Sequence, residues 1–347
     1  MSLFRSQTAR PSDAPVVVCR GLRKAFRSTR RREGLGLLKN LFRREVSEFV
    51  ALHGIDLEIR RGAFVGLIGV NGAGKTTLVK CLTGIIPVTS GTSELLGRDS
   101  FRLRDDEKRR LSLVMGSRSQ LWWDLPAVDS FRLLAEIYEV DRAQLDARVK
   151  AYASRLDVGD RLGVQLRNLS LGERMKMEII GAFLHDPELV FLDEPTIGLD
   201  LLSRETIRLF LREINRERGV TIVLTSHDME DIEETCERLV ILDAGRILFD
   251  GDLVDLKRRL IGKRSVEIHL VPGAPVWDPA LDAEIASLGA SLAKSAPLHL
   301  TFSVPAEHTQ ALVKRLLDHL PVRDIAIERQ PLAELIREIF SGQKVVS

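Results

Sequence analysis

The sequence predicts two domains: an α/β domain built on a largely parallel sheet, followed by a small α+β domain. Three observations support this prediction. The chain has 347 residues, which is more than one domain usually holds. Apolar strand-like runs alternate with helix-like segments up to about Leu260, a pattern typical of parallel sheets. A glycine-rich loop, Gly69–Thr77, lies between such a strand and such a helix.

The first domain is expected to span residues 14–260, with a basic insertion at 27–47. Ligands of open parallel sheets bind at the carboxyl ends of the strands, so residues that follow the strands are the candidates for a site. The strands are expected at Val16–Cys19, Phe49–Ile59, Phe64–Ile68, Leu111–Met115, Leu189–Leu192, Thr221–Thr225, Leu239–Leu242 and Ile247–Phe249.

The second domain is expected to span residues 264–347. Its strand-like segments alternate apolar and polar residues, as half-exposed strands do. No catalytic pattern is recognisable in this part. Strands are expected at Ser265–Leu270, Leu298–Val304 and Ile325–Ile327, and helices at Glu307–Leu320 and Leu332–Ile339.

Composition excludes several classes of protein. The 51 basic and 49 acidic residues leave a net charge of +2, which gives no reason to expect a nucleic-acid partner. No apolar run approaches the roughly 18–20 residues that span a bilayer. Three scattered cysteines show neither metal-ligand spacing nor a disulfide pattern, which favours a reducing compartment. We therefore expect a cytoplasmic chain whose membrane role, if any, comes through a partner.

The loop Gly69–Thr77 fits the phosphate-binding pattern G-x-x-x-x-G-K-[ST] at every fixed position. Glycines let backbone N–H groups converge on an anion, and the following helix N-terminus adds its positive end. Lys75 can reach the β- and γ-phosphates of a nucleotide, and the Thr76 hydroxyl can hold Mg²⁺. The expected nucleotide-binding residues here are Gly69, Asn71, Gly72, Ala73, Gly74, Lys75, Thr76 and Thr77.

Two further strands end in residues suited to phosphate chemistry. The strand Leu189–Leu192 runs into Asp193 and Glu194, for which we expect metal orientation and activation of the attacking water, respectively. The strand Thr221–Thr225 is followed closely by His227, which can donate to a phosphate oxygen. Either pattern alone would more often be an ordinary strand end, and the phosphate loop raises the functional interpretation above that alternative.

A third segment, Leu169–Arg174, reads L-S-L-G-E-R. Ser170 and Glu173 form the capping-box pattern S-x-x-E ahead of an amphipathic helix, so one interpretation is a well-capped helix start. That interpretation leaves the small residue Gly172 unexplained. The second interpretation is an anion site made by Ser170 and Gly172 at the helix N-terminus.

Taken together, these segments resemble the nucleotide-binding domain of ABC (ATP-binding cassette) transporters, from about Val16 to Leu260. The resemblance implies a P-loop NTPase fold of the ABC type that binds ATP with Mg²⁺. It also implies a head-to-tail homodimer or heterodimer, in which Ser170 and Gly172 of one subunit face the other subunit's ATP. In this family Asp200 would communicate between the two sites. Phe26 would stack on adenine, although a core position is an equal alternative.

Two motifs depart from the family pattern. The signature L-S-G-G-Q is L-S-L-G-E here, which resembles a subgroup of bacterial ABC-2-type exporters. The family's Q-loop glutamine falls on Ser117, with Gln120 nearby. Either Gln120 substitutes through a shifted loop, or coupling is weakened.

Two segments suggest a membrane partner. Trp122 and Trp123 lie where the family docks the permease, although adjacent tryptophans are equally often core residues. Leu35–Arg44 has the pattern of a basic amphipathic helix, which suits an anionic membrane surface or a partner. Packing of this helix onto its own domain is the alternative.

The resulting hypothesis is the ATP-hydrolysing subunit of an exporter, acting on a separate permease from the inner face of the cell membrane. The alternative is a soluble ABC-type ATPase acting on ribosomes or DNA. The chain carries one cassette and no long coiled-coil insertion, and both features argue against that alternative.

Overall fold

The computed structural model describes residues 14–30, 45–116, 118–260, 263–272, 279–296, 298–329 and 336. The chain divides into two compact units, Met1–Asp250 and Gly251–Ser347. The second unit includes α9 (Leu253–Leu260), which was expected in the first domain. Among the described residues, no helix has both the length and the apolar character needed to cross a membrane.

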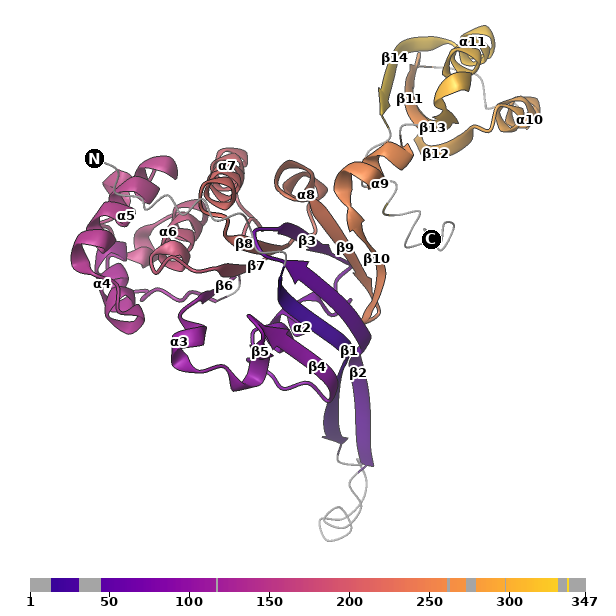
Figure 1. The fold of residues 1–347 in the computed structure, drawn as a ribbon. Helices are drawn as coiled ribbons and strands as arrows, with labels where there is room; N and C mark the ends of the chain where they lie inside the picture. The colour runs from indigo at the N-terminus through magenta and orange to yellow at the C-terminus, as the bar shows by residue number, and fades with distance from the viewer. Residues whose placement is uncertain are drawn as a thin grey trace, which may run out of the picture. The chain divides into compact units, whose positions relative to one another are not determined.

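The centre of the first unit is a six-stranded sheet (Figure 1). The five neighbours β9, β3, β8, β7 and β6 pair in parallel, as the sequence predicted. All residues of β3, β7 and β8 are buried, as expected for a sheet covered on both faces. In sheet order the strands are β10 (Arg246–Asp252), β9 (Arg238–Asp243), β3 (Phe64–Ile68), β8 (Thr221–Thr225), β7 (Leu189–Asp193) and β6 (Leu111–Met115).

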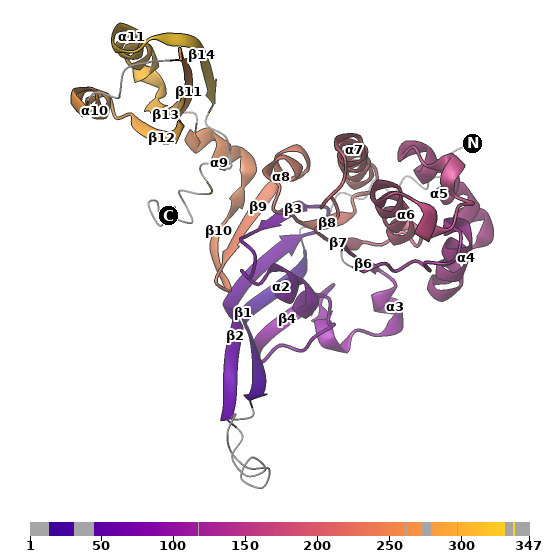
Figure 2. The same ribbon diagram turned by 180° about the vertical axis from the view of Figure 1, so that it is seen from behind.

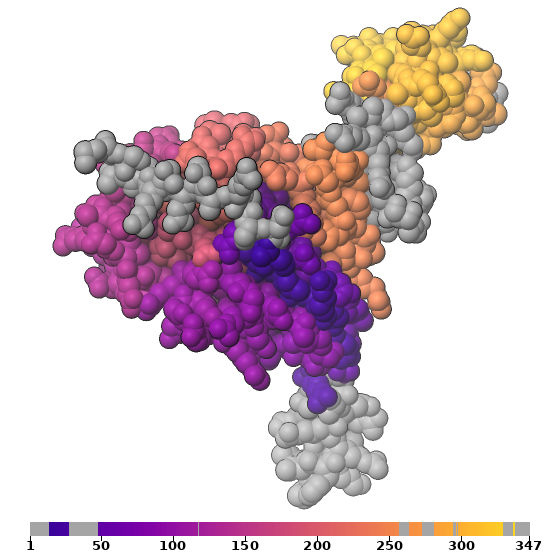
Figure 3. All heavy atoms as spheres, in the orientation of Figure 1, coloured from indigo at the N-terminus to yellow at the C-terminus, as the bar shows by residue number. Residues whose placement is uncertain are grey.

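A second, antiparallel sheet was not anticipated. It has the order β2-β1-β4-β5 and consists of β1 (Pro15–Arg30), β2 (Glu45–Arg60), β4 (Ser90–Leu95) and β5 (Arg98–Asp99). Figure 3 shows β1, in indigo, at the surface. Residues 27–30 and 45–47, which were expected in the basic insertion, continue these two strands. The helix expected at Leu35–Arg44 lies outside the described residues.

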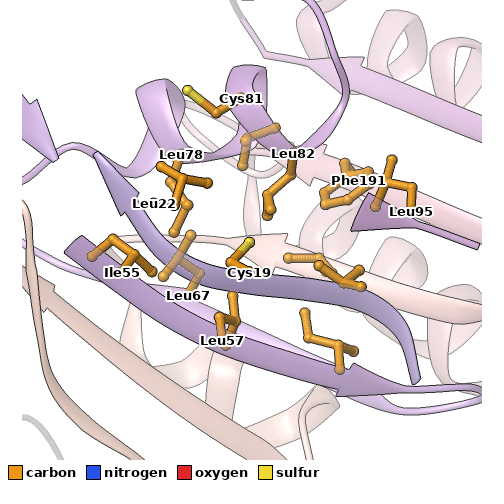
Figure 4. Close-up of a cluster of buried hydrophobic side chains, with 14 of the residues drawn as sticks. Cys19, Leu22, Ile55, Leu57, Leu67, Leu78, Cys81, Leu82, Leu95 and Phe191 are labelled. Carbon is orange, nitrogen blue, oxygen red and sulfur yellow. The ribbon is translucent and has the colours of Figure 1, made fainter. Parts of the chain in front are cut away.

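One hydrophobic core of the first unit lies between the two sheets. Apolar side chains of β1 and β2 meet those of helix α2 (Lys75–Leu82) and strands β3 and β7 (Figure 4). Cys19 and Cys81 are part of this core, and burial raises the pKa of Cys19 to about 12 and that of Cys81 to about 11. Such thiols are unreactive packing residues.

Helices α4 (Ala127–Tyr138), α5 (Arg142–Arg155) and α6 (Leu171–Phe183) gather at one end of the first unit, beyond β6, while α2 lies between the sheets (Figures 1 and 2). Aspartate or serine caps four of the described helices, because a short side-chain oxygen can accept from the free N–H groups of a first turn. The other helices that the structure describes in this unit are α3 (Asp105–Lys108), α7 (Leu201–Arg218), α8 (Met229–Thr235) and the 3₁₀ turns η1 (Ser100–Arg102), η2 (Gly159–Arg161) and η3 (Leu166–Asn168).

The second unit contains a β-α-β-β-α-β arrangement with the antiparallel sheet order β12-β13-β11-β14. Its own core joins the apolar face of this sheet to α10 and α11. The sequence missed β12 and α10, and Leu332–Ile339 lies outside the described residues except for Ile336. The elements are β11 (Lys263–Leu270), α10 (Pro279–Ser287), β12 (Ser291–Ala296), β13 (His299–Pro305), η4 (Ala306–His308), α11 (Thr309–His319) and β14 (Val322–Arg329).

Candidate functional site

The loop after β3 is closely packed against two neighbouring segments. A Cβ atom on Gly69 would lie 2.3 Å from the Leu242 carbonyl oxygen, so a side chain does not fit there. Gly74 has φ 106° and ends the loop at the start of α2, with the Ala51 backbone against it. Because α2 begins directly after this loop, the free N–H groups of its first turn are available to an anion there. Asn71 and Gly72 are exposed, Ala73 is buried, and Thr76 and Thr77 are half-buried.

The ammonium group of Lys75 lies over this loop. Its Nζ donates a hydrogen bond of 2.6 Å to the Gly69 carbonyl and lies 3.7 Å from Oε1 of Glu194. The side chain is only 8% exposed, so its charge is weakly screened by water. A buried cation at this position can neutralise phosphate charge.

Three oxygen groups meet at the carboxyl end of β7. The Thr76 hydroxyl donates to Oδ2 of Asp193 at 3.0 Å, and the Thr225 hydroxyl donates to Oδ1 at 2.7 Å. Carboxylate and hydroxyl oxygens are ligands that suit Mg²⁺, so Thr76 and Asp193 fit a magnesium site. Sequence reasoning missed Thr225. It ends β8, which lies between β3 and β7, and this strand order is not visible in the sequence.

Glu194 is held by its backbone in an unusual conformation. Its φ is 56°, in the left-handed region, and its N–H donates to the carbonyl and hydroxyl oxygens of Thr225 at 3.1 and 3.0 Å. Oε2 of its carboxylate lies 2.5 Å from Nδ1 of His227. The Glu194 side chain is 22% exposed, so water can reach it. This arrangement can act as a general base whose orientation is fixed by a neighbouring histidine.

The signature segment forms the start of α6. Ser170 is exposed and caps the helix, and its N–H lowers the pKa of the Glu173 carboxyl. Gly172 is buried, and a Cβ atom there would lie 2.3 Å from the Ser203 hydroxyl. The close approach of Ser203 therefore explains why glycine is needed at position 172, without reference to a second subunit. Asp200 caps α7 and accepts from the N–H of Ser203, which lowers the pKa of Asp200.

The exposure of three aromatic residues argues against the core positions that the sequence left open for them. Phe26 is 41% exposed and lies opposite Phe49 in the β1–β2 ladder, with Nζ of Lys24 5.0 Å from its ring centre. Trp122 and Trp123 are 41% and 48% exposed. None of the three is a core residue.

The segment that carries Gln120 is attached to α6. Nε2 of Gln120 donates to the Glu178 carbonyl at 3.0 Å, and its backbone N–H donates to the Glu178 carboxylate at 3.1 Å. Among the described residues, no contact joins this amide to Asp193 or Glu194. Ser117 lies outside the described residues. Burial raises the pKa of Glu178, and neighbouring donors, including the Ser119 hydroxyl, partly offset this.

A parallel sheet with a phosphate loop, a buried lysine, a Thr–Asp pair and a Glu–His pair at one edge defines a P-loop nucleotide hydrolase. The chain matches the family model described as ABC transporter over residues 52–197. The ABC transporter ATP-binding protein NatA of Bacillus subtilis (strain 168) is 29% identical over 221 residues, which cover 64% of this chain and 88% of that protein.

Two further comparisons agree with this family. Nod factor export ATP-binding protein I of Cupriavidus pinatubonensis (strain JMP 134 / LMG 1197) is 32% identical over 65% of this chain and 69% of that protein. A solved ATP-binding subunit of an ABC transporter has a TM-score of 0.57 at 25% identity, covering 70% of this chain and 92% of that one. The chain belongs to the family of ABC transporter ATP-binding proteins, and it is an ATPase. This confirms the family predicted from the motifs.

Proposed function

We propose that the chain is the ATP-hydrolysing subunit of an ABC exporter and drives a separate membrane-spanning permease. The observation that carries this proposal is the meeting of Lys75, Asp193, Glu194 and His227 at one sheet edge beside the phosphate loop. Export is favoured over import because relatives named for Nod factor export and daunorubicin resistance are among the matches. Relatives named for methionine import also match, at a similar identity.

The residues of the site divide the chemistry between them. The loop Gly69–Thr77 binds the phosphates of ATP, and Lys75 balances the charge on the β- and γ-phosphates. Thr76 and Asp193 would hold Mg²⁺, which would supply further charge neutralisation when bound. Glu194 accepts a proton from the attacking water. The water oxygen bonds to the γ-phosphorus, and the bond between the γ-phosphorus and the oxygen of the leaving ADP breaks. His227 keeps Glu194 oriented through Oε2, and in its protonated form it can also donate its second ring N–H to a γ-phosphate oxygen.

The proposal includes a dimer, homomeric or heteromeric, that closes on ATP. Exposed Ser170 and the start of α6 from one subunit would face the ATP bound by the other subunit, with Gly172 and Asp200 behind this contact. Phe26 would stack on the adenine ring, since its exposed face is free of core packing. For Gln120 to act as the Q-loop residue, its side chain would have to leave the Glu178 carbonyl and turn toward the nucleotide when ATP binds.

A permease is proposed to contact the exposed Trp122 and Trp123, which would keep the chain at the inner face of the cell membrane. Arg174 of α6 lies over the Trp123 ring, with its guanidinium carbon 4.8 Å from the ring centre. A contact at Trp123 would therefore also reach the helix that begins with the signature segment.

The test is affinity purification of the Glu194→Gln variant with ATP from detergent-solubilised membranes. We expect recovery of a multi-span membrane protein in fixed stoichiometry, and loss of it when Trp122 and Trp123 are both changed to serine. Recovery only from the soluble fraction, with ribosomes or DNA, would replace the transporter by the soluble ATPase.

A further inference from the structure

Three arginines of helix α7, Arg204, Arg208 and Arg212, follow one another at intervals of one turn and contact α8 or the turn before it. Arg204 and Arg208 bind the segment that holds His227. Arg212, one turn further on, binds instead the carbonyl of Glu234 at 3.1 Å, near the end of α8. Arg204 and Arg208 therefore connect α7 to the segment that contains His227, whereas Arg212 does not.

Arg204 joins two segments of the site. Its Nε donates to the Leu199 carbonyl at 3.1 Å, beside Asp200, and its Nη1 donates to Oδ2 of Asp228 at 2.7 Å. Asp228 directly follows His227 and caps α8 through Oδ1. A planar guanidinium can hold both partners at once because its N–H groups point in fixed, separate directions.

Arg208 fixes the other end of the same turn. It pairs with the fully buried Asp231 through contacts of 2.6 Å and is itself 5% exposed. The Asp231 carboxylate also accepts from the hydroxyls of Ser226, at 3.0 Å, and Thr196. Ser226 precedes His227, and Thr196 lies two residues after Glu194, so this one carboxylate connects the two halves of the Glu–His pair.

We infer that Arg204 and Arg208 are positioning residues for hydrolysis, which rests on the proposed roles of Glu194 and His227. Together they fix both flanks of His227, so that Nδ1 stays on Oε2 of Glu194. Arg204 also links the place of His227 to the Leu199–Asp200 segment, so a shift of that segment moves the histidine. In the part of the chain that the structure describes, neither arginine contacts the loop Gly69–Thr77.

The test compares steady-state ATPase kinetics of Arg204→Ala and Arg204→Lys with those of the matched control Arg212→Ala. Arg204→Ala should lower kcat roughly 10- to 100-fold, since a small displacement of a reacting group costs that much, with KM for ATP within about twofold. Arg204→Lys should recover only part of kcat, because a single ammonium cannot serve both Leu199 and Asp228. Arg212→Ala should behave as the unaltered chain does.

A second readout follows the histidine itself. The ring Cε1–H signal of His227, assigned by its loss in His227→Gln, should move in Arg204→Ala and in Arg208→Lys but not in Arg212→Ala. The signal of His53 serves as an internal control. Arg208→Lys keeps a positive charge beside Asp231, which guards against loss of the fold.

The outcomes separate this inference from the proposed function. If Glu194→Gln hydrolyses ATP as fast as the unaltered chain, the assigned chemistry is wrong. If Glu194→Gln is inactive while Arg204→Ala keeps its kcat and an unmoved His227 signal, the chemistry stands and the positioning role is overturned. Equal loss in Arg204→Ala and Arg212→Ala would also overturn it, because the α7–α8 contact as a whole would then be responsible.

Discussion

Lys75 is the residue whose loss should affect nucleotide binding most directly. We expect Lys75→Ala to abolish measurable ATP binding, because a buried cation over the phosphate loop is replaced by a methyl group. The control is Lys80→Ala on the same helix, which should bind as the unaltered chain does. Binding is measured with a fluorescent ATP analogue, and unchanged affinity in Lys75→Ala would remove the phosphate-loop assignment.

His185 gives the clearest pH dependence. Its ring stacks on Tyr138 at 3.9 Å, Nε2 donates to the Leu111 carbonyl, and burial lowers its pKa from 6.5 to about 4. Between these values the unfolded chain binds more protons than the folded one, so stability is complete above pH 6.5 and is lost as pH falls toward 4. The loss amounts to about 3 kcal/mol at most.

The measurement is thermal unfolding of the unaltered chain and of His185→Phe from pH 7.5 to 4.5. Phenylalanine keeps the stacked ring and has no proton to bind. The difference in stability between the two proteins should shift in favour of the variant as the pH falls. A difference that does not change with pH would show that His185 titrates alike in both states.

At the scale of elements, the first turns of α6 and α7 pack directly against each other. Gly172 and Ser203 are in direct contact, and a Cβ atom at 172 would also lie 3.2 Å from Oδ2 of Asp200. Gly172→Ala should therefore displace the signature segment from α7 and destabilise the fold by about 1–3 kcal/mol, as overpacking does.

Thermal unfolding and ATPase activity of Gly172→Ala test this contact. The control is Gly163→Ala, because a Cβ atom there has open space around it. If Gly172→Ala unfolds at the same temperature as the control while ATPase activity falls, the glycine serves the neighbouring subunit and not the α6–α7 contact.

The sequence predicted the motifs well and their surroundings poorly, for a physical reason. The phosphate loop and the Asp193–Glu194 pair depend on residues a few positions apart, so spacing reveals them. Thr225, by contrast, reaches Asp193 only because β8 lies between β3 and β7. Strand order is set by packing over long sequence separations, and no local pattern records it. The same holds for the second sheet and for the bond between Gln120 and Glu178.

At the scale of the whole molecule, the proposed dimer gives a direct prediction. With ATP and Mg²⁺, the Glu194→Gln variant should have a molar mass of twice the 38.9 kDa of one chain. The closed dimer should persist because the variant does not hydrolyse the ATP that holds it closed. Light scattering after size exclusion measures the mass. Adding Ser170→Arg to this variant should return it to the monomer, since a long charged side chain would then stand at the exposed helix start.

A monomer at saturating ATP in Glu194→Gln would argue against closure by dimerisation. A dimer that persists with Ser170→Arg would place the contact elsewhere on the surface. The second unit, with its own core, would then be the next surface to examine by charge substitutions on α11.

The left-handed backbone at Glu194 has a consequence for the thermal tolerance of the protein. A non-glycine residue in that region costs about 1–3 kcal/mol, a sizeable share of the 5–15 kcal/mol that keeps a domain folded. Asparagine and glycine adopt this conformation more readily. An enzyme inactivated by Glu194→Asn or Glu194→Gly should therefore withstand more heat than the active one, which means that selection for heat resistance alone would erode catalysis at this position first.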